Sequence, residues 1–132
     1  MMNVQEPLVD ADELVGNTPM VRLRRLFPQP HVRVFAKLEF YNPTGSIKDR
    51  VVRHIIDDAE RTGRLRPGGT IVESTSGNTG AAIALIAAQR GYRAVLTMPD
   101  KVSREKQNAL KAMGARLGPH AIICFVLDPA VY

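Results

Sequence analysis

Residues 70–98 read TIVESTSGNTGAAIALIAAQRGYRAVLTM, and the order of patterns in them predicts the fold class. Thr70–Glu73 is short and β-rich, Ala81–Arg90 is rich in alanine and stops at Gly91, and Ala94–Met98 is again apolar. Short apolar strands that alternate with helices are typical of parallel sheets built from right-handed crossover units. The sequence therefore predicts an α/β fold, with a parallel twisted sheet and flanking helices.

The loop between the first of these strands and its helix, Ser74–Gly80, consists of hydroxyl and amide side chains and glycines. Such a loop binds anions through its backbone N–H groups and the positive end of the helix that follows, and ligands collect where parallel strands end. It matches neither the P-loop nor the dinucleotide-binding glycine pattern, so its spacing alone predicts another kind of phosphate cradle. The alternative is an ordinary capped turn, in which Ser76 or Thr79 satisfies the helix and nothing binds.

Lys48 lies in the first turn of an amphipathic helix that Ser46 is expected to cap and that runs to about Thr62, before Gly63. Apolar residues follow Lys48 at helical spacing, which predicts that its side chain points along the buried stripe. These residues are Val52, Ile55 and Ile56. Burial and the positive end of the helix both favour a neutral amine, which forms Schiff bases with carbonyl compounds. The alternative is that the ammonium reaches water past a short contact of its stem.

Further elements flank these two patterns. Alternation of apolar and polar residues predicts strands over Met20–Leu23 and Val32–Phe40, which could pair with each other. A helix capped by Ser103 is predicted to about Met113, and the apolar run Ala121–Leu127 could form another strand.

The composition is that of a soluble globular protein, with 132 residues of which 45% are hydrophobic and 23% charged. We expect a cytoplasmic protein without a membrane partner, because no apolar run is long enough to span a bilayer and the start lacks a signal pattern. One cysteine, Cys124, and scattered histidines predict neither a disulfide nor a metal site. The net charge of +5 would suit nucleic acid. The basic residues are dispersed without alternating aromatics, so we expect no nucleic-acid partner and keep a small basic binding module only as a remaining alternative.

Two motifs in this order resemble the cysteine synthase and cystathionine β-synthase family of pyridoxal-phosphate enzymes. They are Asn42–Arg50, NPTGSIKDR, and the loop Ser74–Gly80, STSGNTG. Further similarity lies in Gly16–Val21, in Asp57–Glu60 and in Met98–Ser103, so that the resemblance covers about residues 13 to 115. It implies the fold of the type II pyridoxal-phosphate enzymes.

The resemblance also implies roles for the two motifs. Lys48 would hold pyridoxal 5′-phosphate as a Schiff base and later move the α-proton of the substrate, and Asn78 would hydrogen-bond the 3′-oxygen of the cofactor ring. Four residues of the loop, with nearby backbone N–H groups, would hold the α-carboxylate of the amino-acid substrate. These are Thr75, Ser76, Gly77 and Thr79. The anion expected at this loop is thereby a carboxylate rather than a phosphate.

The reaction that the family implies is β-replacement on serine or an O-activated serine, in which the β-substituent leaves and a thiol or another nucleophile adds. A homodimer is implied for a full-length member. The family also places a glycine-rich phosphate loop further along the chain, and this sequence does not contain it. The alternative is therefore a catalytically inactive fragment that lacks the phosphate-binding loop.

The resemblance to the family also predicts how the chain is divided into domains. Residues 1–40 would carry two strands of a missing large domain, residues 41–115 would form an incomplete small α/β domain that binds cofactor and substrate, and residues 116–132 would be a divergent tail. We therefore expect the amino-terminal part of a two-domain enzyme, in which Thr44 stands where a small residue is common.

Overall fold

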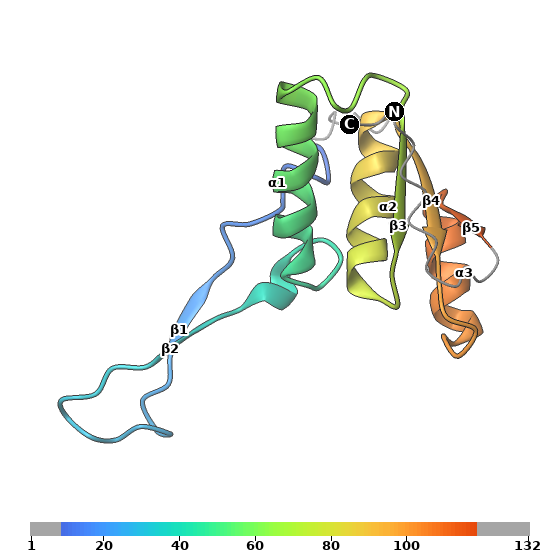
Figure 1. The fold of residues 1–132 in the computed structure, drawn as a ribbon. Coiled ribbons are helices and arrows are strands. Elements are labelled where there is room, and N and C mark those ends of the chain that lie inside the picture. The colour runs from blue at the N-terminus through green and yellow to red at the C-terminus, as the bar shows by residue number, and fades with distance from the viewer. Residues whose placement is uncertain (1–8, 119–132) are drawn as a thin grey trace, which may run out of the picture.

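The computed structural model describes residues 9–118, in which three parallel strands, three α-helices and a protruding two-stranded arm are arranged as in Figure 1. The sheet has the order β3-β4-β5. Its strands are β3 (Thr70–Ser74), β4 (Arg93–Thr97) and β5 (Arg116–Gly118), and both neighbouring pairs are parallel. The predicted α/β class, a parallel sheet with flanking helices, is confirmed.

The helices lie close to where the sequence predicts them. They are α1 (Lys48–Arg61), α2 (Asn78–Arg90) and α3 (Arg104–Ala112). Gly63, Gly91 and Gly114 follow them with φ angles of 74°, 75° and 89°, a conformation that glycine adopts most readily. Ser103 caps α3 as predicted, since its side chain accepts a hydrogen bond from the Lys106 N–H group.

The arm consists of β1 (Met20–Arg22) and β2 (Phe35–Lys37), which pair antiparallel and place Val21 opposite Ala36. The predicted pairing of these strands is therefore confirmed. The predicted extent Val32–Phe40 is too long, because a 3₁₀ turn, η1 (Glu39–Tyr41), follows β2 almost at once.

The sequence does not predict β5, because it assigns Arg116 to the divergent tail. In the structure Arg116 lies opposite Val95 and begins the third strand of the sheet. The predicted strand Ala121–Leu127 and Cys124 lie outside the described residues. The predicted domain boundaries at residues 40 and 115 stay predictions.

The core is built around α2, which lies between α1 and the sheet (Figure 1). The buried apolar residues of α2 are Ala82, Ile83, Ala84, Ile86 and Ala87. They pack with Val52 and Ile56 from α1 and with Leu96 from β4. Because most of these α2 residues are small, the two layers can approach closely and fill the space between them. This packing fixes where α1 begins relative to α2.

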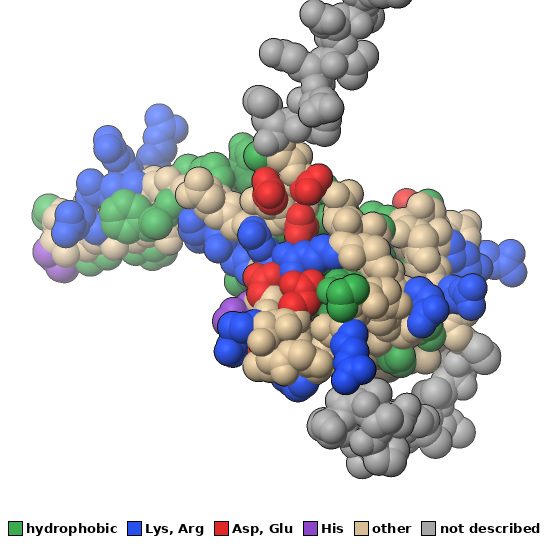
Figure 2. Space-filling view, turned by 90° about the horizontal axis from the view of Figure 1, so that it is seen from above, with side chains coloured by type: hydrophobic (Ala, Val, Ile, Leu, Met, Phe, Trp, Pro, Cys, Tyr) green, Lys and Arg blue, Asp and Glu red, His purple; other side chains and the backbone are tan. Residues whose placement is uncertain are grey.

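Charged side chains join the far ends of the two helices. Arg90 of α2 contacts three carboxylates: Asp12 at 2.7 Å, Asp57 at 2.7 Å and Glu60 at 3.0 Å. Figure 2 shows acidic and basic side chains gathered at this end of the molecule. Burial of the guanidinium opposes its charge, but hydrogen bonds to Asp57 and Asp12 raise the pKa of Arg90 above its usual range. This cluster ties the amino-terminal turn to α1 and α2.

Candidate active site

The first turns of α1 and α2 lie at the same end of the molecule, where β3 and β4 finish (Figure 1). This follows from the order of the elements, because α1 leads into the start of β3 and α2 follows the end of β3, so that both helices run opposite to the strand. Lys48 begins α1, and Asn78 begins α2. The two sequence motifs are therefore brought to one edge of the fold.

The prediction that Lys48 points along the buried stripe is wrong, because Lys48 is exposed. The buried side of α1 runs through Asp49, Val52 and Ile56, whereas the side chain of Ile55 is 58% exposed. Successive helical residues are about 100° apart, so Lys48 lies at the flank of the buried side rather than at its centre. The burial on which the predicted desolvation depends is therefore absent.

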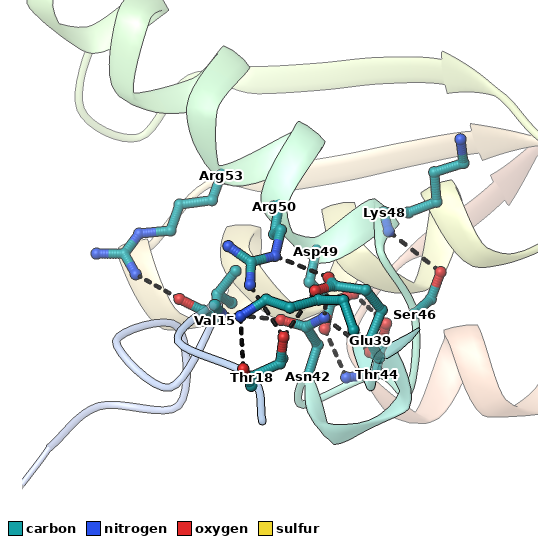
Figure 3. Close-up of polar contacts among 12 residues, drawn as sticks. Val15, Thr18, Glu39, Asn42, Thr44, Ser46, Lys48, Asp49, Arg50 and Arg53 are labelled. Carbon is teal, nitrogen blue, oxygen red and sulfur yellow. Dashed lines mark hydrogen bonds and ion pairs between the residues drawn. The ribbon is translucent and has the colours of Figure 1, made fainter. Parts of the chain in front are cut away.

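The alternative, in which the side chain of Lys48 reaches water, is confirmed. Lys48 Nζ forms no hydrogen bond or ion pair within residues 9–118. Figure 3 shows its side chain extending away from the polar network below it. Ser46 is buried, and its Oγ accepts a hydrogen bond from the Lys48 backbone N–H group at 3.1 Å. The predicted cap is nevertheless one residue too early, because Ile47 is the N-cap of α1 and no side chain caps this helix. The amine is left available for a ligand.

A polar network lies beneath the start of α1 (Figure 3). Arg50 Nε contacts Glu39 Oε2 at 2.7 Å, and the Thr18 hydroxyl donates to Glu39 Oε1 at 2.7 Å. The Asn42 side chain donates to Glu39 Oε2 at 2.9 Å and accepts from the Gly16 N–H group at 2.8 Å. The network thus connects the loop before α1 with the turn around Gly16.

Sequence reasoning missed this network, although Gly16–Val21 and Asn42–Arg50 both carry the family resemblance. Glu39 lies within the stretch Val32–Phe40, whose alternation predicts a strand and no functional role for this residue. One signal in the sequence could have indicated the network. Glu39 is a carboxylate that lies between two stretches similar to the family, and both stretches contain hydrogen-bond donors. Hydrogen bonds from Arg50 and Thr18 lower the pKa of Glu39 from its ordinary value of 4.5 to about 2.

We expect this network to lose its stabilising effect in acid. Because the pKa of Glu39 is depressed in the folded state, its contribution is fully present above pH 4.5 and is lost as the pH falls towards 2. Chemical unfolding of the wild type should therefore show a steeper loss of stability across this interval than unfolding of Glu39→Gln. Glu105→Gln, an exposed position on α3, serves as the control and should keep the wild-type slope. Equal slopes for wild type and Glu39→Gln would contradict the assignment.

The loop before α2 is organised by Thr75. Its side chain is buried, and its Oγ1 accepts hydrogen bonds from the N–H groups of Gly77 at 3.2 Å and Gly80 at 3.1 Å. The Thr75 N–H group in turn donates to the carbonyl of Thr97 in the neighbouring strand at 2.9 Å. The capped-turn alternative therefore named the wrong residues. The side chain that accepts hydrogen bonds from the N–H groups of this turn is that of Thr75, and not that of Ser76 or Thr79.

The remaining polar side chains of the loop have no partner in the described part of the chain. Ser76 and Asn78 are exposed and Thr79 is half-buried, and none of these side chains forms a hydrogen bond within residues 9–118. They lie at the amino end of α2, where unpaired N–H groups and the helix dipole favour an anion. The arrangement can hold an anionic group at the end of the fold where α1 and Lys48 also begin.

The described residues contain no group of three or more histidine, cysteine or acidic side chains that could hold a metal ion. Over the same part of the chain, no helix is both long and apolar enough to cross a membrane.

The profile of a protein family described as "Pyridoxal-phosphate dependent enzyme" matches residues 11–120. The chain belongs to this family. The resemblance that the two motifs predict is therefore confirmed, and the matched range includes β5. The members of the family depend on pyridoxal phosphate.

The names of similar proteins agree with this family assignment. A probable cysteine synthase of Bacillus subtilis (strain 168) is 52% identical over 105 residues, which cover 80% of this chain and 34% of the relative. A cystathionine beta-synthase of Rattus norvegicus is 49% identical over 112 residues, covering 83% and 20% of the two chains. The chain thus spans about a third of the length of the bacterial relative.

Two solved structures resemble the fold. O-ureido-L-serine synthase matches with a TM-score of 0.78 and 46% identity, over 86% of this chain and 36% of that one. Cysteine synthase from Entamoeba histolytica matches with a TM-score of 0.76 and 39% identity, over 90% and 38%. Both comparisons place the described fold within the type II architecture that the resemblance implies.

Proposed function

We propose that this chain carries the lysine and the substrate loop of a pyridoxal-phosphate enzyme that replaces the β-substituent of serine or an O-activated serine. The observation that carries the proposal is the placement of Lys48 and Asn78 at the starts of two neighbouring helices. Neither side chain has a hydrogen-bond partner within residues 9–118. The proposal draws further support from a relative solved as a lysine-to-alanine variant with O-ureido-L-serine bound.

The residues present fit the ring end of the cofactor. An exposed primary amine is the group that binds an aldehyde covalently, and the exposed Asn78 amide can donate a hydrogen bond to a ring oxygen. Pyridoxal phosphate, when bound, withdraws electrons from the substrate α-carbon and so makes the α-proton acidic. In this proposal Lys48 Nζ would hold the cofactor, would be released when the substrate amine takes its place, and would then accept the α-proton as a free amine. No acid within residues 9–118 forms an ion pair with it.

The loop would orient the substrate. The Ser76 and Thr79 hydroxyls, with the N–H groups at the start of α2, would hold the α-carboxylate. Thr75 can take part although its oxygen already accepts two hydrogen bonds, because the hydroxyl proton is still free to donate. Gly77 would contribute by having no side chain between the loop and the substrate.

The proposal is tested by adding pyridoxal phosphate to the purified chain and recording the visible absorption band of the bound cofactor. Reduction with borohydride followed by peptide mapping should place the label on Lys48. Lys48→Ala should lose both the band and the label, whereas Lys111→Ala, an exposed lysine in the last turn of α3, should keep both. Label spread evenly over exposed lysines, or no band in the wild type, would contradict the proposal.

Serine or an O-activated serine should then change the band, and a thiol should restore it as product is released. A chain that binds the cofactor at Lys48 but produces no thioether would instead match the inactive-fragment alternative. The identity of the nucleophile, a homodimeric state and the cytoplasmic location stay predictions.

A further inference from the structure

The residue after Lys48, Asp49, is the one buried acid of α1. Asp49 has no exposed surface, although a carboxylate is among the groups least often buried. Its charge is favoured by the positive end of the helix, since it lies in the first turn. Such burial requires strong partners for both oxygens.

Thr44 supplies both partners. Its N–H group donates to Asp49 Oδ2 at 2.7 Å, and its hydroxyl donates to Asp49 Oδ1. Hydrogen bonds to a carboxylate are stronger than those between neutral groups. The two hydrogen bonds link Thr44 to Asp49 across the turn that leads into α1. Gly45 lies in this turn with a φ of 77°, which lets the chain fold back towards Asp49. The start of α1 is thereby held against the loop that precedes it.

The direction of Lys48 follows from this anchor. Asp49 is about 100° around the helix from Lys48, and Arg50 is about 200° around it. Asp49 is fixed by Thr44 and Arg50 by Glu39, so the two residues after Lys48 are both held on other sides of the helix. The remaining direction for Lys48 is outward, as Figure 3 shows.

We propose that Asp49, held by both donors of Thr44, is the positioning residue that fixes the first turn of α1 and hence the direction of the Lys48 amine. This inference rests on the proposed function, in which Lys48 holds the cofactor. Asp49 and Thr44 do not themselves contact cofactor or substrate in this proposal. The hydroxyl of Thr44 is the part of the anchor that a single substitution can remove without changing the side chain's shape.

The experiment compares Thr44→Val with Thr44→Ser, which keeps the hydroxyl. Thr62→Val is the matched control, because the Thr62 hydroxyl donates to the Asp58 carbonyl at 2.7 Å at the other end of the same helix. Amide hydrogen exchange of residues 47–50 is measured without cofactor, and the affinity and circular dichroism of the visible band are measured with pyridoxal phosphate. Asp49→Asn serves as a second variant.

Thr44→Val should speed exchange of residues 47–50 and weaken cofactor binding by about tenfold each, since one hydrogen bond to a buried charge is lost. The dichroism of the band should fall as well, because it reports how rigidly the bound ring is oriented. Thr44→Ser should restore all three quantities, and Thr62→Val should leave them unchanged. The thermal unfolding midpoint identifies any variant that has lost its fold.

Unchanged exchange, affinity and dichroism in folded Thr44→Val would overturn the inference. Faster exchange with unchanged affinity and dichroism would also overturn it, because the anchor would then serve the fold alone. A wild type with no band would instead refute the proposed function. In that case the exchange of residues 47–50 still decides whether the Thr44 hydroxyl fixes this turn.

Discussion

Gly80→Ala is expected to destabilise the chain by about 2–3 kcal/mol, although alanine is the better helix former by about 1 kcal/mol. A Cβ atom at this position would lie 2.6 Å from Thr75 Cγ2 and 3.3 Å from Leu96 Cδ1. Both neighbours are buried, and Leu96 is completely so. The first distance is too short for any stable contact, so the side chain of Thr75 must move.

Thr75 cannot move without loss. Rotation of its side chain would carry Oγ1 away from the N–H groups of Gly77 and Gly80, each hydrogen bond being worth about 1 kcal/mol. Displacement of its backbone would instead break the bond to the Thr97 carbonyl. The substitution therefore disturbs the same loop that is proposed to hold the substrate carboxylate.

A double variant isolates this contact. Thr75→Ser removes the methyl group that the new Cβ would meet and keeps the hydroxyl, so Thr75→Ser/Gly80→Ala should recover most of the stability that Gly80→Ala loses. Denaturant unfolding of the wild type, the two single variants and the double variant measures the coupling free energy between positions 75 and 80. Additive effects of the two substitutions would show that the loss has another origin.

Local patterns were sufficient for much of the fold. Glycines marked the ends of the helices because their positive φ angles are a local requirement, and α1 and α3 begin and end close to the predicted residues. The alternation over Val32–Phe40 predicted β2 but not its length, because η1 interrupts it through hydrogen bonds within its own turn. β5 was not predicted because Arg116 begins the stretch that no longer resembles the family, and its pairing with β4 is not visible in the sequence.

The candidate site was predictable in its members but not in its geometry. The loop residues and Lys48 follow from composition and from the family resemblance. The exposure of Lys48 does not, because hydrophobic spacing gives the apolar side of α1 only broadly, and packing against α2 selects Val52 and Ile56 as its buried centre. The Glu39 network joins residues up to 32 positions apart, which no periodicity reveals.

Replacing Arg90 with methionine is expected to cost about 2–4 kcal/mol at neutral pH. Removing one partner of a buried ion pair costs about 3–5 kcal/mol, whereas an exposed pair contributes about 0–1 kcal/mol. The side chains of Arg90 and Asp12 are 19% and 10% exposed, so this pair lies near the buried limit, while Asp57 at 47% contributes little. Without the guanidinium, the Asp12 carboxylate would lose its ion pair, whereas Asp57 would keep Arg53 at 3.9 Å and Glu60 would keep the Tyr92 hydroxyl at 2.8 Å.

Arg61→Met is the matched control, because Arg61 pairs with Asp58 on the same helix but its side chain is 72% exposed. Its loss should stay below about 1 kcal/mol. Asp12→Asn should recover part of the stability that Arg90→Met loses, since it removes the carboxylate that has lost its ion pair. Equal losses for Arg90→Met and Arg61→Met would mean that the cluster joining α1 and α2 behaves as an ordinary surface network.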